Sequence, residues 1–276
     1  MSSFDFTSYD FYSNRYEEDL VTNIVDSLKK ILEEDRQEKQ PLFLRMKDGF
    51  LETIAQKLVE KKLKTLLIGI SGESASGKST FVDWTVRACV KDKIEGIYTV
   101  LRCDDYYKDT SKELREAGSY EALFRTGFSF DTPDALNLEL FKQHLVELKK
   151  GNTVVSPRYD FVTCESFADG DVKKPARIVL SEGLYVLNES IRDVIDVKVY
   201  VYTPLDVLKS RWYKRAATRG KTGEAADSQF LDVNRTAQLY IRPAMEISDV
   251  VINGLVDVGY IQEITKKIFS VIENSY

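Results

Sequence analysis

The stretch that decides the fold is Leu66-Leu67-Ile68-Gly69-Ile70-Ser71-Gly72-Glu73-Ser74-Ala75-Ser76-Gly77-Lys78-Ser79-Thr80-Phe81. An apolar run typical of a buried strand leads directly into the pattern G-x-x-x-x-G-K-S/T. Small residues let backbone N–H groups surround phosphate oxygens, and a following helix points its positive N-terminus at the same anion. We therefore expect Lys78 to reach the outer phosphates of a nucleotide and Ser79 to bind Mg²⁺. A glycine-rich turn without a ligand is the alternative.

Every residue of this loop is a candidate for nucleotide binding: Gly72, Glu73, Ser74, Ala75, Ser76, Gly77, Lys78, Ser79 and Thr80. The loop by itself indicates only that a nucleotide binds. Ligands of an open parallel sheet bind beyond the carboxyl ends of its strands. The residues that follow the other strands must therefore indicate what happens to the nucleotide.

The length of 276 residues suits one large α/β domain, or one domain plus an appendage, and 43% hydrophobic with 30% charged residues is an ordinary soluble balance. A formal net charge of −5 gives no sign of a surface that coats a polyanion, so we expect no nucleic-acid partner. We see no apolar run of membrane-spanning length and no signal pattern. Cys89, Cys103 and Cys164 lack paired spacing, which argues against disulfides or a zinc site and favours a cytoplasmic location.

We interpret residues 1–63 as an N-terminal extension packed on a core domain of residues 64–276. Apolar residues repeat at helical spacing over 17–34 and over about 48–63, so both segments are expected to be amphipathic helices. Residues 1–16 hold six aromatic residues. This tail could dock on its own domain, contact another subunit or form a flap over the site, and these alternatives stay open.

Beyond residue 63, apolar runs and helical segments alternate, which predicts an α/β fold with a parallel sheet sandwiched by helices. The expected strands are 66–70, 97–101, 177–180, 197–202 and 250–252, and the expected helices are 78–90, 133–149, 204–218 and 260–273. Thr132-Pro133 and Thr203-Pro204 should each begin a helix, because a capping hydroxyl precedes a proline. Gly151 should end the helix over 133–149.

Acidic residues directly follow two of the expected strands. Asp104 and Asp105 come after 97–101, and one of them could accept a proton from an attacking hydroxyl or position the metal. Glu182 follows 177–180, where a carboxylate can orient a metal beside a phosphate loop. A solvated or purely structural acid is the alternative at both places.

Two segments, 128–135 and 156–161, combine aromatic residues with a carboxylate and a turn residue. Aromatic faces beside a hydrogen-bond acceptor suit a planar base and a sugar diol. Proline and aspartate can also simply cap helices and turns, and we prefer that role for Asp134.

A cluster of cations lies in and after the second half of the expected helix 204–218: Lys209, Arg211, Lys214, Arg215, Arg219 and Lys221. Gly220 and Gly223 indicate a mobile segment, so we predict a basic lid over about 209–230 that closes on phosphates. A solvated helix end with cations that complement the helix dipole is the alternative.

With these motifs in this order, the chain resembles the uridine kinase group of the phosphoribulokinase and uridine–cytidine kinase superfamily. The resemblance covers about residues 64–254 and rests on five motifs: Ser-Ala-Ser-Gly-Lys-Ser (74–79), Asp-Asp-Tyr-Tyr-Lys (104–108), Phe-Asp-Thr-Pro-Asp-Ala (130–135), Pro-Arg-Tyr-Asp-Phe (157–161) and Ser-Glu-Gly (181–183). The first is generic to many nucleotide-binding proteins, whereas the third and fourth are far more specific.

The resemblance implies a parallel five-stranded kinase core with a lid. It also implies transfer of the γ-phosphate of ATP to the 5′-hydroxyl of a ribonucleoside, with uridine or cytidine as the expected acceptor. By the family pattern Asp104 is the base toward that hydroxyl, and Ser79, Asp104 and Glu182 hold Mg²⁺. Lys78 and Arg215 match catalytic cations.

The same resemblance assigns the acceptor site. Tyr107 flanks the reacting hydroxyl and Asp131 holds the ribose hydroxyls. The residues around the base are Phe130, Tyr159 and Phe161. Arg219 falls near a lid arginine that contacts the nucleotide, and Lys221 and Gln229 align with polar residues that reach the sugar.

Three departures bear on these expectations. Cys164 stands where the group usually has a histidine that touches the pyrimidine edge, and cysteine is a weak hydrogen-bond partner. Thr236 replaces the proline that usually follows the lid. Residues 1–63 have no counterpart in a minimal uridine kinase, so a homo-oligomer such as the tetramer common in that group stays an open alternative.

Other functions are weighed against this one. The same loop serves kinases of nicotinamide riboside, pantothenate and sugar phosphates. A hydrolytic switch would need N-K-x-D-like and D-x-x-G motifs, which we do not find, and a non-catalytic subunit would not need Lys78, Asp104 and Glu182. A Ser-His-Asp hydrolase is disfavoured because the single histidine, His144, is expected on the side of a helix.

Overall fold

The computed structural model describes residues 7–59, 65–90, 97–218, 220 and 222–273. Its centre is a six-stranded sheet with the order β1-β10-β9-β2-β8-β3. The strands are β1 (Phe43–Met46), β2 (Leu66–Gly72), β3 (Tyr98–Arg102), β8 (Ile178–Glu182), β9 (Val197–Tyr202) and β10 (Val250–Asn253). Neighbours are parallel except β1, which runs antiparallel to β10.

The five predicted strands and the parallel sheet are confirmed, but the expected count of five is one short. The sixth strand, β1, escaped sequence reasoning because it has only four residues and lies at the sheet edge. Arg45 interrupts its apolar residues, and Leu44 and Arg45 in its middle are both exposed, so the strand lacks the alternation of buried and exposed residues that sequence reading relies on.

Alternate residues of the central strands enter two separate cores. Ile178 and Leu180 of β8 pack into one core, whereas Val179 between them packs into the other. A parallel sheet covered on both faces therefore needs apolar residues along the whole strand, which explains the apolar runs in the sequence.

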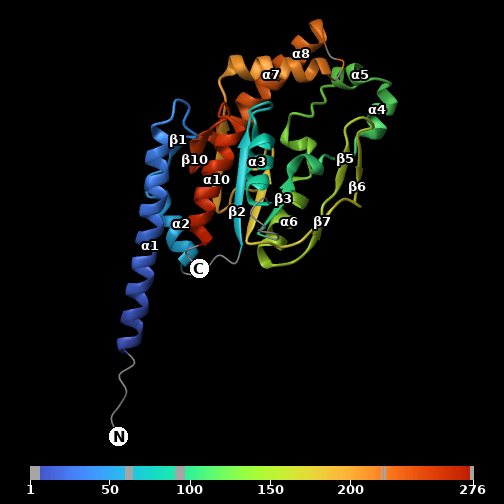
Figure 1. Cartoon of the computed structure of the whole chain (residues 1–276). Helices are drawn as coiled ribbons and strands as arrows, with labels where there is room; N and C mark the ends of the chain where they lie inside the picture. The colour runs from blue at the N-terminus through green and yellow to red at the C-terminus, as the bar shows by residue number, and fades with distance from the viewer. Residues whose placement is uncertain (1–6, 60–64, 91–96, 219, 221, 274–276) are drawn as a thin grey trace.

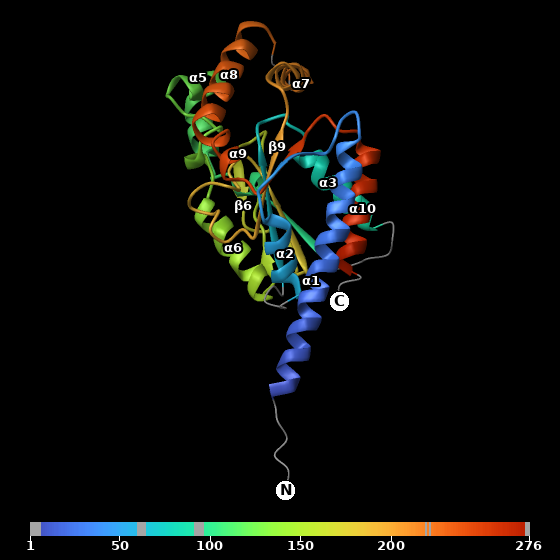
Figure 2. The ribbon, with the colours of Figure 1, turned by 90° about the vertical axis from the view of Figure 1, so that its left-hand side faces the viewer.

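Helices form a layer on each face of the sheet. The first core includes α1 (Thr7–Arg36), α2 (Phe50–Val59), α3 (Lys78–Val90) and α10 (Val258–Glu273). The second includes η1 (Cys103–Tyr106), α6 (Leu138–Lys150), η3 (Ala237–Ile241) and α9 (Ala244–Ile247). Figure 2 shows α3 and α10 on one side of the sheet and α6 and α9 on the other.

The remaining elements lie around the carboxyl ends of the parallel strands. Helices α7 (Leu205–Thr218) and α8 (Gly223–Thr236) extend over this end, with α4 (Ser111–Ala117) and α5 (Tyr120–Arg125) beside them (Figure 1). Two small antiparallel sheets complete the fold: β5 (Arg158–Asp160) with β6 (Glu165–Phe167), and β4 (Val154–Val155) with β7 (Val172–Lys173). Among the described helices, none has the length and hydropathy to cross a bilayer.

Helix α1 packs on the body from Leu20 onward. Ile24, Val25, Leu28 and Ile31 are buried in the first core, whereas Tyr16 is 70% exposed. The first turns of α1 extend away from the body, at the end opposite α7 and α8 (Figures 1 and 2). Residues 1–6 of the aromatic tail lie outside the described part of the chain.

One expected helix start is wrong, whereas α7 begins at Leu205, one residue from the predicted start at Pro204. Pro133 opens only a short 3₁₀ turn, η2 (Pro133–Ala135), and α6 begins five residues later with the Asn137 side chain accepting from Leu140 N. The chain between them is extended because it bonds to the segment after β3: Lys108 N donates to Ala135 O and Asn137 N donates to Tyr106 O. Gly151 ends α6 in a left-handed conformation, as predicted.

Asp35 fastens the N-terminal segment to the sheet. Its buried carboxylate accepts hydrogen bonds from Leu42 N at 2.8 Å, Phe43 N at 2.9 Å and the Tyr260 hydroxyl at 3.0 Å. We expect Asp35→Ala to lower the free energy of unfolding by about 3 kcal/mol, because two backbone donors lose their acceptor. Chemical denaturation measures this.

Glu34→Ala is the matched control, since Glu34 is exposed and pairs only with Lys267. This variant should lose less than about 1 kcal/mol. Equal losses in the two variants would contradict the anchoring role of Asp35.

His144 of α6 lies 2.7 Å from the Tyr106 hydroxyl through Nδ1. Burial lowers the pKa of His144 below its ordinary value of 6.5. As the pH falls, the unfolded chain therefore takes up a proton at this histidine before the folded chain does, so the free energy of unfolding should decrease below about pH 6.5.

Because the chain has one histidine, an NMR titration of its Hε1 resonance reads this pKa directly. His144→Gln should flatten the dependence of thermal stability on pH just below pH 6.5, and an unchanged slope would refute this origin.

Candidate functional site

The phosphate loop connects β2 to α3 at the carboxyl edge of the sheet. At its first residue, Gly72, a Cβ would lie 2.6 Å from the carbonyl oxygen of Val201, so β9 leaves room only for glycine. Ala75 and Gly77 have φ values of 67° and 99°, which turn successive backbone groups toward the loop's interior. The geometry is that of an anion cradle at a helix N-terminus.

The residues that follow β9 and β10 contact the backbone of the phosphate loop. The Thr203 hydroxyl donates to Ser76 O at 2.9 Å. A Cβ on Gly254 would lie 2.2 Å from the same Ser76 oxygen. The loop backbone is therefore in direct contact with the segments that follow β9 and β10.

Lys78 is buried at the start of α3, and its Nζ donates to Glu73 O at 3.1 Å. Burial lowers the pKa of Lys78, and the carboxylates of Glu182 and Asp104 oppose that shift. The ammonium group thus faces two acids across the site.

Glu182, at the end of β8, lies beside Ser79. Ser79 Oγ is 3.3 Å from Glu182 Oε2, while Arg102 Nη1 is 2.6 Å from the other carboxylate oxygen. Gly183 lets Cys103 approach, since a Cβ at Gly183 would lie 2.4 Å from Cys103 Cβ. This hydroxyl and carboxylate fit Mg²⁺, which takes one or two carboxylates and completes its octahedron with phosphate oxygens and water.

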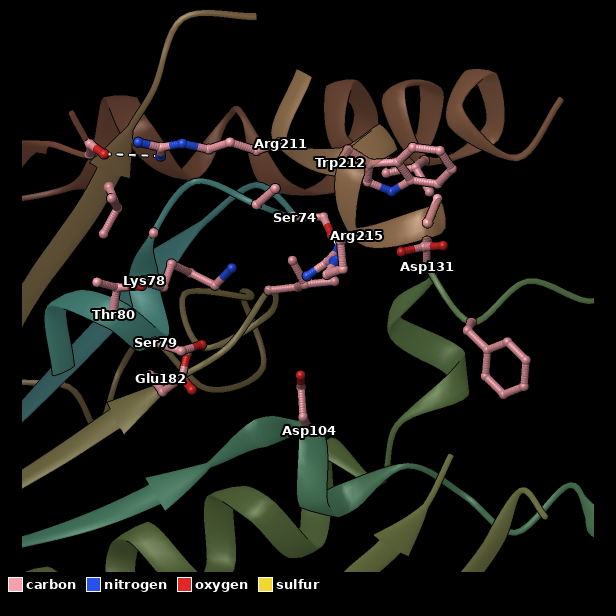
Figure 3. Close-up of a pocket in the computed structure, with 18 of the residues that line it drawn as sticks. Ser74, Lys78, Ser79, Thr80, Asp104, Asp131, Glu182, Arg211, Trp212 and Arg215 are labelled. Carbon is pink, nitrogen blue, oxygen red and sulfur yellow. Dashed lines mark hydrogen bonds between the residues drawn. The ribbon is translucent and has the colours of Figure 1, made fainter. Parts of the chain in front are cut away.

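Asp104 belongs to η1, directly after β3, and points across the site toward Lys78 and Arg215 (Figure 3). Burial raises the pKa of the Asp104 carboxyl. The Lys78 ammonium opposes this rise, whereas the nearby Glu182 carboxylate increases it. A carboxylate with a raised pKa is a better proton acceptor than an ordinary one.

A cluster of aromatic rings forms the other half of the site. The ring of Tyr107 lies 6.0 Å from Phe130, 5.2 Å from Tyr159 and 5.6 Å from Phe161, measured between centroids. The Tyr185 hydroxyl holds the backbone carbonyl of Asp131 at the edge of this cluster. We call these four rings and Asp131 the aromatic pocket.

Cys164 is buried beside the aromatic pocket, with φ at 57°. Its sulfur lies 3.3 Å from the Tyr120 hydroxyl, which donates to Phe161 O at 2.7 Å. Sequence reasoning missed Tyr120 and Phe124, which also line the site. The sequence did offer one signal for them: Tyr120 and Phe124 are spaced four residues apart and directly follow Ser119, whose side chain caps α5.

Helices α7 and α8 form a hairpin over the site, which we call the lid. Trp212 and Ala216 of α7 pack with Ala226 and Val233 of α8 in a small core of their own. From α7, Arg215 donates to the Ser74 hydroxyl of the phosphate loop, and Arg211 Nη1 donates to Gly254 O at 3.0 Å. Arg211 was part of the predicted cation cluster but was not singled out as a site residue.

One pocket of about 1000 Å³ brings most of the predicted site residues together (Figure 3). Its lining includes Ser74, Ala75, Gly77, Lys78, Ser79, Thr80, Asp104, Tyr107, Phe130, Asp131, Tyr159, Phe161, Glu182, Arg215 and Gln229. Gly72, Glu73 and Ser76 belong to the loop but are not part of this lining. Arg219 and Lys221 lie outside the described residues.

Known proteins share this chain's sequence and architecture. The model of the phosphoribulokinase / uridine kinase family matches residues 67–259. The uridine kinases of Borrelia garinii subsp. bavariensis and Clostridium tetani are each 33% identical, over 67% and 68% of this chain and 85% and 87% of theirs. The solved YGR205w protein has the same fold at 19% identity, with a TM-score of 0.50 over 75% of this chain and 92% of its own. The chain therefore belongs to the phosphoribulokinase and uridine kinase family.

Proposed function

We propose that the protein transfers the γ-phosphoryl group of ATP, with Mg²⁺, to the 5′-hydroxyl of a ribonucleoside, with uridine or cytidine as the preferred acceptor. Family membership makes it a small-molecule kinase. One observation carries the finer proposal: a single pocket holds the phosphate loop, Asp104 and the aromatic pocket. Phosphoryl transfer needs this kind of positioning and charge neutralisation more than covalent chemistry.

On the donor side, the loop from Gly72 to Thr80 binds the phosphates and Lys78 contacts the outer ones. Ser79 and Glu182, with Asp104 nearby, hold Mg²⁺, which neutralises charge on the phosphate oxygens when bound. Arg215 extends from the lid to Ser74, so it is placed to reach the same phosphates. We assign Arg219 to the nucleotide as well.

On the acceptor side, Asp104 removes the proton of the attacking hydroxyl, and Tyr107 flanks that hydroxyl. Asp131 accepts hydrogen bonds from the ribose diol, and Lys221 and Gln229 add contacts to the sugar. The rings of Phe130, Tyr159 and Phe161 hold the base. Figure 3 shows Asp104 and Asp131 across the site from Lys78, and this placement supports transfer from the phosphates to an acceptor bound beside the two acids.

A second candidate is transfer to another small hydroxylated metabolite, such as nicotinamide riboside, pantothenate or a sugar phosphate. The observation that favours it is Cys164, whose weakly polar sulfur lies against Tyr120. The Tyr120 proton is already donated to Phe161 O, so this wall offers a pyrimidine edge little polar recognition. Under either candidate we place the enzyme in the cytoplasm and leave a homo-oligomer as an alternative to the monomer.

The acceptor is tested by a panel of ribonucleosides, nicotinamide riboside, pantothenate and sugar phosphates with ATP and Mg²⁺, read by ADP release. We expect uridine and cytidine to stimulate release most. Stimulation by none of the ribonucleosides, with stimulation by a vitamin or sugar, would replace the first candidate by the second.

The role of Asp104 is tested by Asp104→Asn. We expect kcat to fall by roughly 10²- to 10⁴-fold, because the amide cannot accept the hydroxyl proton. ATP affinity, measured by calorimetry, should stay nearly unchanged. Asp105→Asn is the matched control, since this adjacent acid does not line the pocket, and it should keep most of its turnover. Full turnover in Asp104→Asn would remove the base from this mechanism.

A further inference from the structure

The phosphate loop carries an acid of its own. Glu73 is the second residue of the loop, and its side chain is only 16% exposed. A carboxylate so close to the seat of a triphosphate repels the ligand unless a cation neutralises it. The phosphate loop therefore needs a cation from another segment to neutralise Glu73.

Arg242 supplies that cation. Its Nε and Nη2 atoms donate to Glu73 Oε1 and Oε2, each at 3.0 Å, in a bidentate pair. This geometry is the strong and directional form of a guanidinium–carboxylate contact. Arg242 follows the π-helical turn η3, whose Ala237 and Ile241 are buried, so its backbone is fixed in the second core.

The same guanidinium contacts the lid. Arg242 Nη2 donates to Asn234 Oδ1 of α8 at 2.6 Å. From α7, Arg215 contacts Ser74, the next residue of the loop. Each helix of the lid is thus bonded to one of two consecutive loop residues, and on the α8 side Arg242 is the link. Because Glu73 O also accepts from Lys78 Nζ, the position of Glu73 bears on the position of the catalytic lysine.

We propose that Arg242 is a positioning residue for the phosphate loop, which neutralises Glu73 and holds the loop and α8 in the arrangement that accepts the nucleotide. The inference rests on the proposed function only in taking the ligand of the loop to be ATP. Arg242 is not part of the pocket lining, so it acts through Glu73 rather than by touching the phosphates.

The test is calorimetric binding of the Mg²⁺ complex of a non-hydrolysable ATP analogue, which requires no knowledge of the acceptor. Arg242→Gln should weaken binding roughly tenfold or more, because it leaves a charged partner unpaired. The loss should shrink only in part as salt is raised, since Glu73 is 16% exposed and added ions screen a largely buried charge weakly. The double variant Glu73→Gln with Arg242→Gln should recover most of the affinity, because the repelling charge is gone.

Arg235→Gln is the matched control. Arg235 lies in the last turn of α8 and also pairs with a carboxylate, Asp232, but it is 72% exposed, and no bond from it to the loop is seen among the described residues. Its affinity should equal that of the wild type. Arg242→Lys keeps the charge without the bidentate geometry and should be intermediate.

Two results would overturn the inference: wild-type affinity in both Arg242 variants, or a double variant that binds as weakly as Arg242→Gln. If Arg242→Gln does not fold, Arg242→Lys and the double variant still decide between these outcomes, with thermal melting as the check. Absence of binding by the wild type would instead refute the ATP site itself, so the two failures are distinguishable.

Discussion

The backbone of one loop must bind an anion, and most of the site is arranged around that requirement. In the phosphate loop, Gly72 gives room for the close approach of β9. Thr203, after β9, and Gly254, after β10, both contact the backbone of Ser76. Because β2, β8 and β3 are parallel neighbours, their carboxyl ends deliver Ser79, Glu182 and Asp104 to one edge. Parallel pairing therefore converts residues far apart in the chain into one constellation.

The site carries cations and carboxylates in similar number, so its charge is not uniformly positive. Lys78 and Arg215 face Glu182 and Asp104, and Arg102 bridges Glu182 to Asp83. In a partly enclosed pocket each charge changes the proton affinity of the others, so burial raises the pKa of Asp104 while Lys78 restrains the rise. A metal and a triphosphate add charges of both signs to a site that is already close to neutral.

The sequence was most informative where local chemistry and fold agree. The phosphate loop, the strands and the acids after them could be predicted because apolar runs and their C-terminal neighbours are local signals. Two aromatic segments, 128–135 and 156–161, could be proposed from their composition, but the roles of their individual rings and of Tyr107 came only from family motifs, since rings from three segments meet in space. Arg242 could not be found, because its role depends on a tertiary contact with Glu73, and the contact of Tyr120 with Phe161 O is likewise tertiary, so the local aromatic pair marked only its presence. Helix α6 started late for the same reason, as hydrogen bonds to Tyr106 and Lys108 keep the preceding segment extended.

The edge strand β1 of the N-terminal segment covers the edge of β10. It pairs with β10, which supplies Val250, Val251 and Ile252 to the two cores. A chain beginning at the family-matched region would leave β10, four residues long and mostly apolar, as an edge strand with unpaired N–H and C=O groups. Such an open edge recruits strands from other molecules. The appendage would thus keep the enzyme from self-associating into aggregates, whatever else it does.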